Sequence, residues 1–398
     1  MFDKTIALKI FEAFSIERWN DLVRPFEMME MDKSAEKAVC AYIIGKFEER
    51  RGESVDWSYI IHGMFFDLLR KIALCDIKAP VQRMIRDGYP AEYARLNEWV
   101  VEQYRPILRD DSLVAAFSSW LLEPADAKSV SWRVLRAAHK YSAMREIEIL
   151  RPVNEAFRIV PIEKGLNRDI EGFLDLRGMQ LLLGKQRPYE FLMEVERLRF
   201  QTRWNQTPRV PKTSVLGHSF YTAILTFLLG RENGVGGRRE YNNFFAALFH
   251  DLPEAVTRDI ISPVKRATDQ LPAIVKEIED KIVEHELLPL MDEAYRDEIR
   301  YFTEHEFENR VRDAGKRTRV VSFEEMRGAC AGDEYEPIDG RLIRVADHIS
   351  AFIEADRSIS YGITSVHLQD GKKNILASYP EGATVNGFDM NAFLRSFG

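Results

Sequence analysis

The chain has 398 residues, of which 45% are hydrophobic and 30% are charged, a composition typical of a soluble globular protein large enough for two domains. Its formal net charge of −7 argues against general nucleic-acid binding. No apolar stretch reaches membrane-spanning length, and the amphipathic start of the chain carries acidic residues, unlike a signal peptide. The three cysteines show no CxxC spacing, so we expect free thiols and a cytoplasmic protein without membrane contact.

Helical periodicity runs through the chain from its N-terminus, broken by proline and glycine, and no convincing series of alternating strands appears. The sequence therefore predicts an all-α protein. The glycine-bearing stretch 231–241 lacks a GK[ST] motif, which favours a loop between helices over a phosphate loop. Residues 309–340 are mixed in character and predict a lid or a partner surface, and the last segment, 361–398, predicts irregular chain packed on the helical body.

Two histidines and two aspartates in the second half of the chain suit one shared metal ion. His218 lies in an apolar segment with helical spacing, His250-Asp251 ends the apolar run FFAALFHD, and Asp347 lies in the amphipathic segment RLIRVADHISAFIEA. We expect these ligands to converge from three helices around a buried site. The alternative is that the His-Asp pair is a chance dipeptide.

Two imidazoles and two carboxylates favour a single divalent ion, with Mn, Co, Mg, Fe and Zn all compatible, and leave positions open for water. No cysteine is placed to complete a closed structural zinc site. A metal ion in such a site activates water near neutral pH and polarises a phosphoryl oxygen. The ligand set therefore favours hydrolysis of a phosphate ester.

Two carboxylates are candidates for acid–base chemistry. Glu254 follows His250 by four residues, so on a continuing helix it would face the same side and could orient or deprotonate a water or protonate the leaving oxygen. Pro253 tightens or ends that helix, which weakens this expectation. Asp259 is the second candidate. For both carboxylates, an ordinary helix cap or surface charge is the alternative.

Basic and aromatic residues near these motifs are candidates for substrate binding. Arg203 is the strongest phosphate ligand because a guanidinium fork matches phosphate oxygens, and Lys265 is a weaker one. Trp204 would either line the pocket for a base or sugar or be an ordinary core aromatic. His285 and His305 lie beside acidic residues on charged segments, so we expect them at the surface rather than at a second metal.

Five segments, RLRFQTRW, SVLGHS, LFHDLPEAVTRDIISPVKRA, TEH and LIRVADHISAFIEA, occur in that order between residues 188 and 360. Together they resemble HD-domain metal-dependent phosphohydrolases, most closely the bacterial 5′-deoxynucleotidase branch. The resemblance implies that His218, His250-Asp251 and Asp347 bind the metal. It further implies that Arg203-Trp204 and Glu254 match the family's arginine–tryptophan pair and its acidic residue.

The same resemblance aligns Thr257-Arg258-Asp259 with a TGD segment, in which arginine here replaces glycine. That replacement would add a cation near the site or crowd it. The implied function is hydrolysis of a small phosphorylated substrate, a nucleoside or deoxynucleoside 5′-monophosphate. The alternative is a regulatory protein that binds a nucleotide in an HD-like pocket without turnover.

The chain also resembles itself. IERWNDLVRP near the start matches QTRWNQTPRV, with Trp19 opposite Trp204 at an offset of 204 − 19 = 185. FFDLLRKIALCDIKAPVQR matches FHDLPEAVTRDIISPVKR, with Asp76 opposite Asp259 at 259 − 76 = 183, and VLRAAHKYSA matches LIRVADHISA. These matches occur in the same order in both halves, so we predict an internal duplication. Chance similarity between helical segments is the alternative.

The metal ligands are missing from the first copy. Ala35 or Glu36 would stand opposite His218, Asp67-Leu68 opposite His250-Asp251, and His139 opposite Asp347. We therefore expect residues 1–150 to be a degenerate helical domain, 151–187 a connector, 188–360 the catalytic domain and 361–398 a tail. Regulation, homodimerisation or substrate presentation are the expected uses of the first domain.

Overall fold

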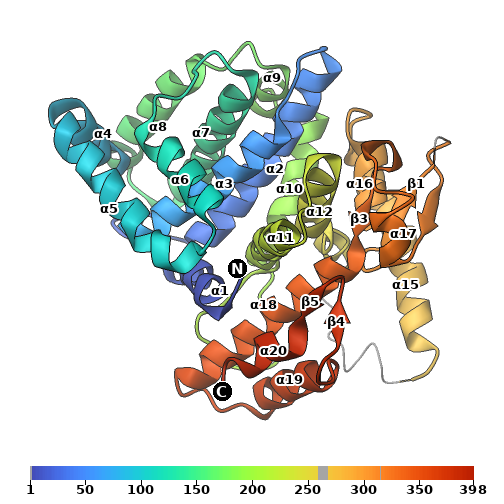
Figure 1. Ribbon diagram of the computed structural model, residues 1–398. Coiled ribbons are helices and arrows are strands. Elements are labelled where there is room, and N and C mark those ends of the chain that lie inside the picture. The colour runs from blue at the N-terminus through green and yellow to red at the C-terminus, as the bar shows by residue number, and fades with distance from the viewer. Residues whose placement is uncertain (1, 259–267, 314) are drawn as a thin grey trace.

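The computed structural model describes residues 2–258, 268–313 and 315–398. It is mostly helical, as the sequence predicts, with a few short strands (Figure 1). Within these residues, no helix is both long enough and apolar enough to cross a lipid bilayer.

The N-terminal half is a set of helices that mostly begin at acidic or serine caps. Asp3, Asp56, Asp110 and Ser129 each accept a hydrogen bond from a backbone N–H in the first turn of the helix that follows, which satisfies a donor with no partner inside the helix. The helices are α1 (Lys4–Phe11), α2 (Glu30–Arg50), α3 (Trp57–Leu74), α4 (Ala79–Gly88), α5 (Pro90–Leu108), α6 (Asp111–Leu122) and α7 (Val130–Leu150).

The segment expected as a connector is itself helical. It contains α8 (Ala156–Glu171), which packs on α7, and α9 (Arg177–Leu183), which packs on α2. The C-terminal half then follows with α10 (Arg187–Phe200), α11 (Val215–Glu232), α12 (Gly237–Phe249), α13 (Glu254–Thr257), α15 (Leu271–Ile282), α16 (Arg296–Thr303), α17 (Phe323–Arg327), α18 (Gly340–Ser360), α19 (Val366–Ala377) and α20 (Met390–Arg395). The glycine-bearing stretch contains the loop between α11 and α12, as predicted.

Short strands occur in two places where the sequence analysis expected mixed or irregular chain. Residues 309–340 contain an antiparallel sheet in the order β2-β1-β3, formed by β1 (Asn309–Arg312), β2 (Thr318–Val320) and β3 (Ile338–Asp339). The C-terminal segment contains α19, the hairpin of β4 (Thr384–Val385) and β5 (Phe388–Asp389), and α20. The expectation of an irregular tail is therefore wrong, because α19 has 12 residues but buries only Leu368 and so shows no apolar stripe in sequence, while the other elements are short.

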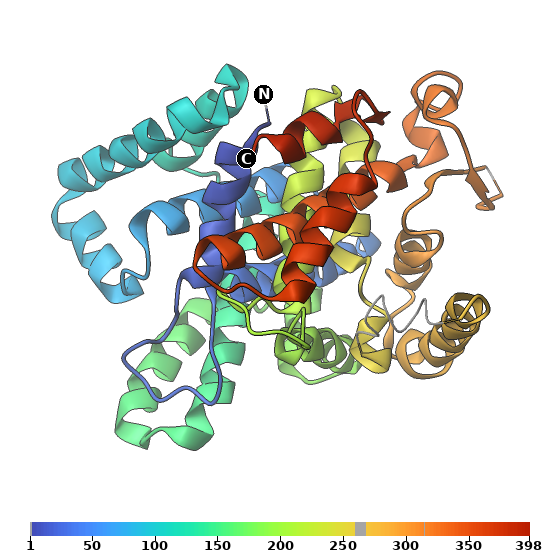
Figure 2. The same ribbon diagram turned by 90° about the horizontal axis from the view of Figure 1, so that it is seen from below.

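One hydrophobic core runs through both halves of the chain. A single cluster of buried side chains extends from Phe2 to Leu394. The helices α2 and α11 pack against each other where the blue-to-green N-terminal helices meet the yellow-to-red C-terminal ones (Figures 1 and 2). Residues 215–230 of α11 are all buried, which is the expected behaviour of a helix that is apolar on every side. The metal-ligand candidate on α11 therefore sits in the most enclosed helix of the second half.

The two halves repeat one set of backbone contacts at a constant spacing. An antiparallel bridge joins Glu17 to Met29, and another joins Thr202 to Ser214, with 202 − 17 = 185 and 214 − 29 = 185. Each bridge closes a loop that leads into a long helix, α2 in the first case and α11 in the second. The tryptophans of the two loops, Trp19 and Trp204, have φ values of 54° and 55°. The loops thus share their pairing, their spacing and an uncommon left-handed residue.

Candidate metal centre

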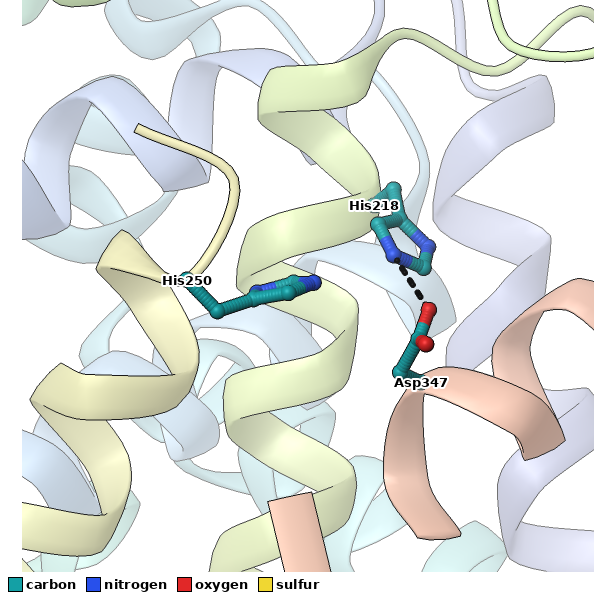
Figure 3. A group of neighbouring side chains, drawn as sticks. All are labelled: His218, His250 and Asp347. Carbon is teal, nitrogen blue, oxygen red and sulfur yellow. Dashed lines mark ion pairs between the residues drawn. The ribbon is translucent and has the colours of Figure 1, made fainter. Parts of the chain in front are cut away.

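His218 is held in a fixed orientation inside α11. Its side chain is fully buried, and its Nδ1 lies 2.8 Å from the Ser350 hydroxyl of α18. The opposite ring atom, Nε2, faces Asp347 and lies 3.2 Å from its Oδ1 (Figure 3). The Ser350 contact fixes the imidazole through one nitrogen and leaves the other for a ligand, the arrangement seen around histidines that bind metals.

His250 offers its Nε2 to the same space. The sequence suggested a helix continuing past this residue, but α12 ends at Phe249 and His250 is its C-cap. Its Nδ1 lies 2.7 Å from the carbonyl oxygen of Ala247, and a carbonyl can only accept, so Nδ1 carries the proton. In the neutral ring, Nε2 then keeps its lone pair, and Figure 3 shows the ring directed toward His218 and Asp347.

The four predicted ligands come together in the structure. The donor atoms of His218, His250 and Asp347 lie within 4.8 Å of one another, and Asp251 Oδ2 lies 3.3 Å from His250 Nε2 and 3.7 Å from His218 Nε2. The two Nε2 atoms and Asp251 Oδ2 are buried and have no hydrogen-bond partner among the described residues. Buried polar atoms are normally satisfied. Three that face one another with nitrogen and oxygen lone pairs fit a divalent cation.

The electrostatics keep these side chains in the state that binds metal. Burial opposes the charge of Asp347, but its contact with His218, with further positive charge from His250 and Arg344, holds the pKa of that carboxyl well below its usual range. Burial and the nearby Arg203 lower the pKa of His218, so the imidazole stays neutral near pH 7. A carboxylate and a neutral imidazole are the forms that coordinate metal.

Arg203 reaches the edge of this site and is anchored from behind by Glu354. Its Nε donates to Glu354 Oε2 at 3.2 Å, and its Nη1 lies 3.7 Å from Asp251 Oδ2. Thr213 Oγ1 also donates to Glu354, at 2.7 Å. Burial disfavours the charge of Arg203, but the surrounding carboxylates, led by Glu354, raise its pKa above the ordinary value. The guanidinium is thus charged and positioned beside the ligands.

Glu354 is a functional residue that the sequence analysis missed. A signal was present, because Asp347, Ser350 and Glu354 are spaced i, i+3 and i+7 and lie on one face of α18. Asp347 is itself a ligand candidate, Ser350 fixes the ring of His218, and Glu354 anchors Arg203. A single helix face therefore organises much of the site.

Trp204 is held by contacts within the protein. Its Nε1 donates to Glu354 Oε2 at 2.8 Å, and its indole packs so closely on α19 that a Cβ added at Gly371 would lie 2.4 Å from the ring. These contacts explain why a glycine stands at position 371. A role for Trp204 against a base or sugar remains a prediction.

Glu254 reaches the site by a route different from the predicted one. The residues after His250 form a turn, and Glu254 begins the short helix α13, where it is half-buried. Its negative charge contributes to the raised pKa of Arg203, so its carboxylate lies on the arginine side of the site. Asp259 and Lys265, the other predicted acid–base and phosphate-binding residues, lie outside the described residues.

Arg258 occupies the position where the TGD segment has glycine. Its φ of 64° and ψ of 159° belong to a region used almost only by glycine, and its side chain is exposed. The backbone thus keeps the geometry that glycine would provide. Because the side chain is exposed, it does not crowd the ligands.

Phe307 and Arg344 also lie next to the ligand candidates, and the sequence analysis did not identify either residue. The ring of Phe307 lies 5.9 Å from that of His250, centroid to centroid. The guanidinium of Arg344 lies 4.4 Å from the centroid of the Phe307 ring, and its Nη1 is 3.6 Å from Asp347 Oδ2. Arg344 is thus a second positive charge beside the ligands.

The remaining histidines of this half lie away from the site. His285 and His305 are exposed, as predicted, and His348 turns away from its neighbour Asp347 to contact the Tyr379 hydroxyl at 2.7 Å.

Comparison with known proteins agrees with this geometry. Residues 195–376 match the HD domain family model, and this segment contains the four ligands, Arg203 and Glu354. No curated protein matches the chain. HD domains bind divalent metals and are generally hydrolases. Residues 195–376 are therefore similar to HD domains, and the four candidate ligands lie together inside the matched segment.

Proposed function

We propose that the protein hydrolyses a small phosphate monoester, a nucleoside or deoxynucleoside 5′-monophosphate, with one divalent metal ion. The proposal depends mainly on three buried atoms that could bind a metal, Nε2 of His218, Nε2 of His250 and Oδ2 of Asp251. They have no hydrogen-bond partner among the described residues and lie next to the charged Arg203. A metal site without an adjacent cation would fit many reactions. A metal site with an anchored arginine beside it fits phosphate chemistry.

The metal ion would supply Lewis acidity, which activates water and polarises the phosphoryl group. His218, His250, Asp251 and Asp347 would hold it, and the contacts of His218 with Ser350 and of His250 with the Ala247 carbonyl orient the two rings toward the shared space. The chain's other residues then bind and orient the substrate.

Arg203 would bind the phosphate oxygens, because Glu354 fixes its Nε side and leaves the rest of the guanidinium directed at the site. Arg344 would add a second positive charge next to Asp347. Glu254, whose charge acts on Arg203, would exchange a proton with the water or with the leaving oxygen. The nucleotide part of the proposal rests on the likeness of the motifs to 5′-deoxynucleotidases.

Phosphate release tests this proposal. The protein, stripped of metal and then loaded with Mg, Mn, Co or Zn, is assayed on nucleoside and deoxynucleoside 5′-monophosphates, on the matching triphosphates and on p-nitrophenyl phosphate. We expect metal-dependent release from monophosphates, with His250→Ala as the inactive control. Tight nucleotide binding without release under any metal would instead favour the regulatory alternative.

A further inference from the structure

The first half of the chain contains a counterpart of the arginine anchor just described. Arg18 donates to both carboxylate oxygens of Glu146, and the indole of Trp19 donates to Oε2 at 2.8 Å. In the second half, Arg203-Trp204 make the corresponding contacts to Glu354. The offsets are 203 − 18 = 185 for the arginine and 354 − 146 = 208 for the glutamate. The bridged loop, the long helix that follows it and the glutamate that anchors the arginine therefore occupy corresponding positions in the two halves.

These offsets identify the residue of the first half that corresponds to His218. An offset of 185 places Lys33 opposite His218, since 218 − 185 = 33. The sequence alignment, which placed Ala35 or Glu36 there, was therefore shifted by two or three residues. The bridge between Glu17 and Met29 corrects it, because it fixes where α2 begins relative to its loop.

The counterparts of two metal ligands also touch each other. Lys33 Nζ lies 2.9 Å from Nδ1 of His139, which stands opposite Asp347 because 347 − 208 = 139. Asp67 stands opposite His250, and it pairs with Lys37 Nζ at 3.1 Å. Ammonium groups thus occupy the space that corresponds to the metal centre, and a divalent cation would be repelled there.

Lys33 brings a buried amine into this site without a carboxylate partner at close range among the described residues. The residue is 2% exposed, and no carboxylate oxygen among the described residues lies within 4.0 Å of its Nζ. Burial, together with the nearby charges of Arg18 and Lys37, lowers its pKa to about 7. A buried ammonium without a counter-charge is unfavourable, and an anion would relieve that cost.

Arg18 is not a free cation of this site. Glu146 and Glu30 both pair with it at 2.7 Å, so its charge is satisfied. His139 and Arg136, one turn apart on α7, are only half-buried, so the surface around Lys33 is partly open. An incoming anion would therefore approach past Arg136 and His139 and reach the buried Lys33 behind them.

We propose that residues 1–150 contain a second, metal-free copy of the site, which binds a phosphate-type anion at Lys33 and His139. The anion would be inorganic phosphate or the phosphate group of a monoester, since either is compact and doubly charged. The proposal does not depend on hydrolysis in the second half, and the experiment below removes that half's contribution.

Phosphate binding is measured by isothermal titration in the double variant His250→Ala, Arg203→Ala, freed of metal, so that the second half no longer holds phosphate. We expect one phosphate per chain, and at least tenfold weaker binding when Lys33→Met is added. Lys71→Met is the matched control, because Lys71 lies on the neighbouring helix α3 and is already paired with Asp76 at 3.1 Å. It should leave phosphate affinity within about twofold.

A second readout needs no change at Lys33. In the same double variant, phosphate should raise the midpoint of thermal unfolding (Tm) relative to sodium chloride at the same ionic strength, because a ligand that binds only the folded chain stabilises it. A deoxynucleoside monophosphate added as a competitor shows whether the site binds the phosphate group of a monoester as well as inorganic phosphate. Absence of binding in the double variant, equal binding with Lys33→Met, or a Tm that phosphate leaves unchanged would each overturn the proposal.

Discussion

Replacing Glu354 by glutamine separates the anchoring of Arg203 from metal binding. The substitution keeps the size of the side chain and removes its charge. Glu354 is fully buried and accepts hydrogen bonds from Arg203, Trp204 and Thr213. Its Oε1 lies 3.9 Å from Nδ1 of His218, the ring nitrogen on the side away from Asp347, so the metal should stay bound while Arg203 loses its fixed position.

The expected loss of stability follows from the ionisation of Glu354. Burial opposes its charge, but Arg203, with smaller help from Arg209 and His218, lowers its pKa from 4.5 to about 2. At about 1.4 kcal/mol for each pKa unit, this corresponds to about 3 kcal/mol of folding stability at pH 7. Because the folded pKa lies below the unfolded one, this contribution is complete above about pH 4.5 and disappears as the pH falls toward 2.

Glutamine resembles the protonated glutamate, which fixes the expected pH profile. In urea unfolding, Glu354→Gln should be about 3 kcal/mol less stable than the original protein at pH 7, and the two should converge as the pH approaches 2. Phosphate release should fall at least tenfold, with metal content unchanged by elemental analysis.

The matched control is Glu146→Gln in the first half. Glu146 anchors Arg18-Trp19 in the same way, and its pKa is also lowered to about 2, against burial, chiefly by Arg18. It should show a similar loss of stability and leave phosphate release intact. Equal loss of turnover in both variants, or no loss of stability in Glu354→Gln, would refute the anchoring argument.

Four further predictions concern ligands, substrate binding, packing and the first half. His250→Ala or Asp251→Ala should abolish metal binding and hydrolysis while the circular dichroism of the helices is kept; unchanged metal content would disprove their role as ligands. Arg203→Ala should lower turnover at least tenfold with metal retained, and wild-type kinetics would make this arginine structural. Arg310→Met should destabilise the protein by at least about 3 kcal/mol in urea, because the buried guanidinium donates to five backbone carbonyls; a change under 1 kcal/mol would contradict this. Restoring ligands to the first half should raise the metal content from about one to about two ions per chain, and an unchanged content would argue against the equivalence of the two sites; the substitutions are Lys33→His, Asp67→His, Leu68→Asp and His139→Asp.

The helical fold and the set of ligand candidates could be predicted because both depend on local pattern. His218 and Asp347 lie in long segments with helical spacing, and a pair such as His250-Asp251 is visible in any alignment of motifs. The position of Glu254 was less predictable. A helix continuing from α12 and a turn followed by α13 both bring this residue near His250, and the sequence alone did not distinguish them.

The supporting residues could not be predicted because they depend on contacts between distant segments. Ser350 and Glu354 gain their roles only when α18 packs against α11 and the loop that carries Arg203. The fully buried Arg310 looks like a surface residue in sequence. The position of Lys33 opposite His218 was found from the backbone bridge between Glu17 and Met29. A bridge of this kind leaves no periodic pattern in the sequence.

The shared core has a consequence for any attempt to divide this protein. Arg199 of the second half lies fully buried against Glu36 and Glu146 of the first, and the Tyr221 hydroxyl donates to the carbonyl of Ala7 at 2.8 Å. A fragment beginning near residue 188 would leave Arg199 without its carboxylates and expose one side of α11 to water. Such a fragment should aggregate or unfold rather than act as a small enzyme. The second half therefore needs the first half in order to stay folded.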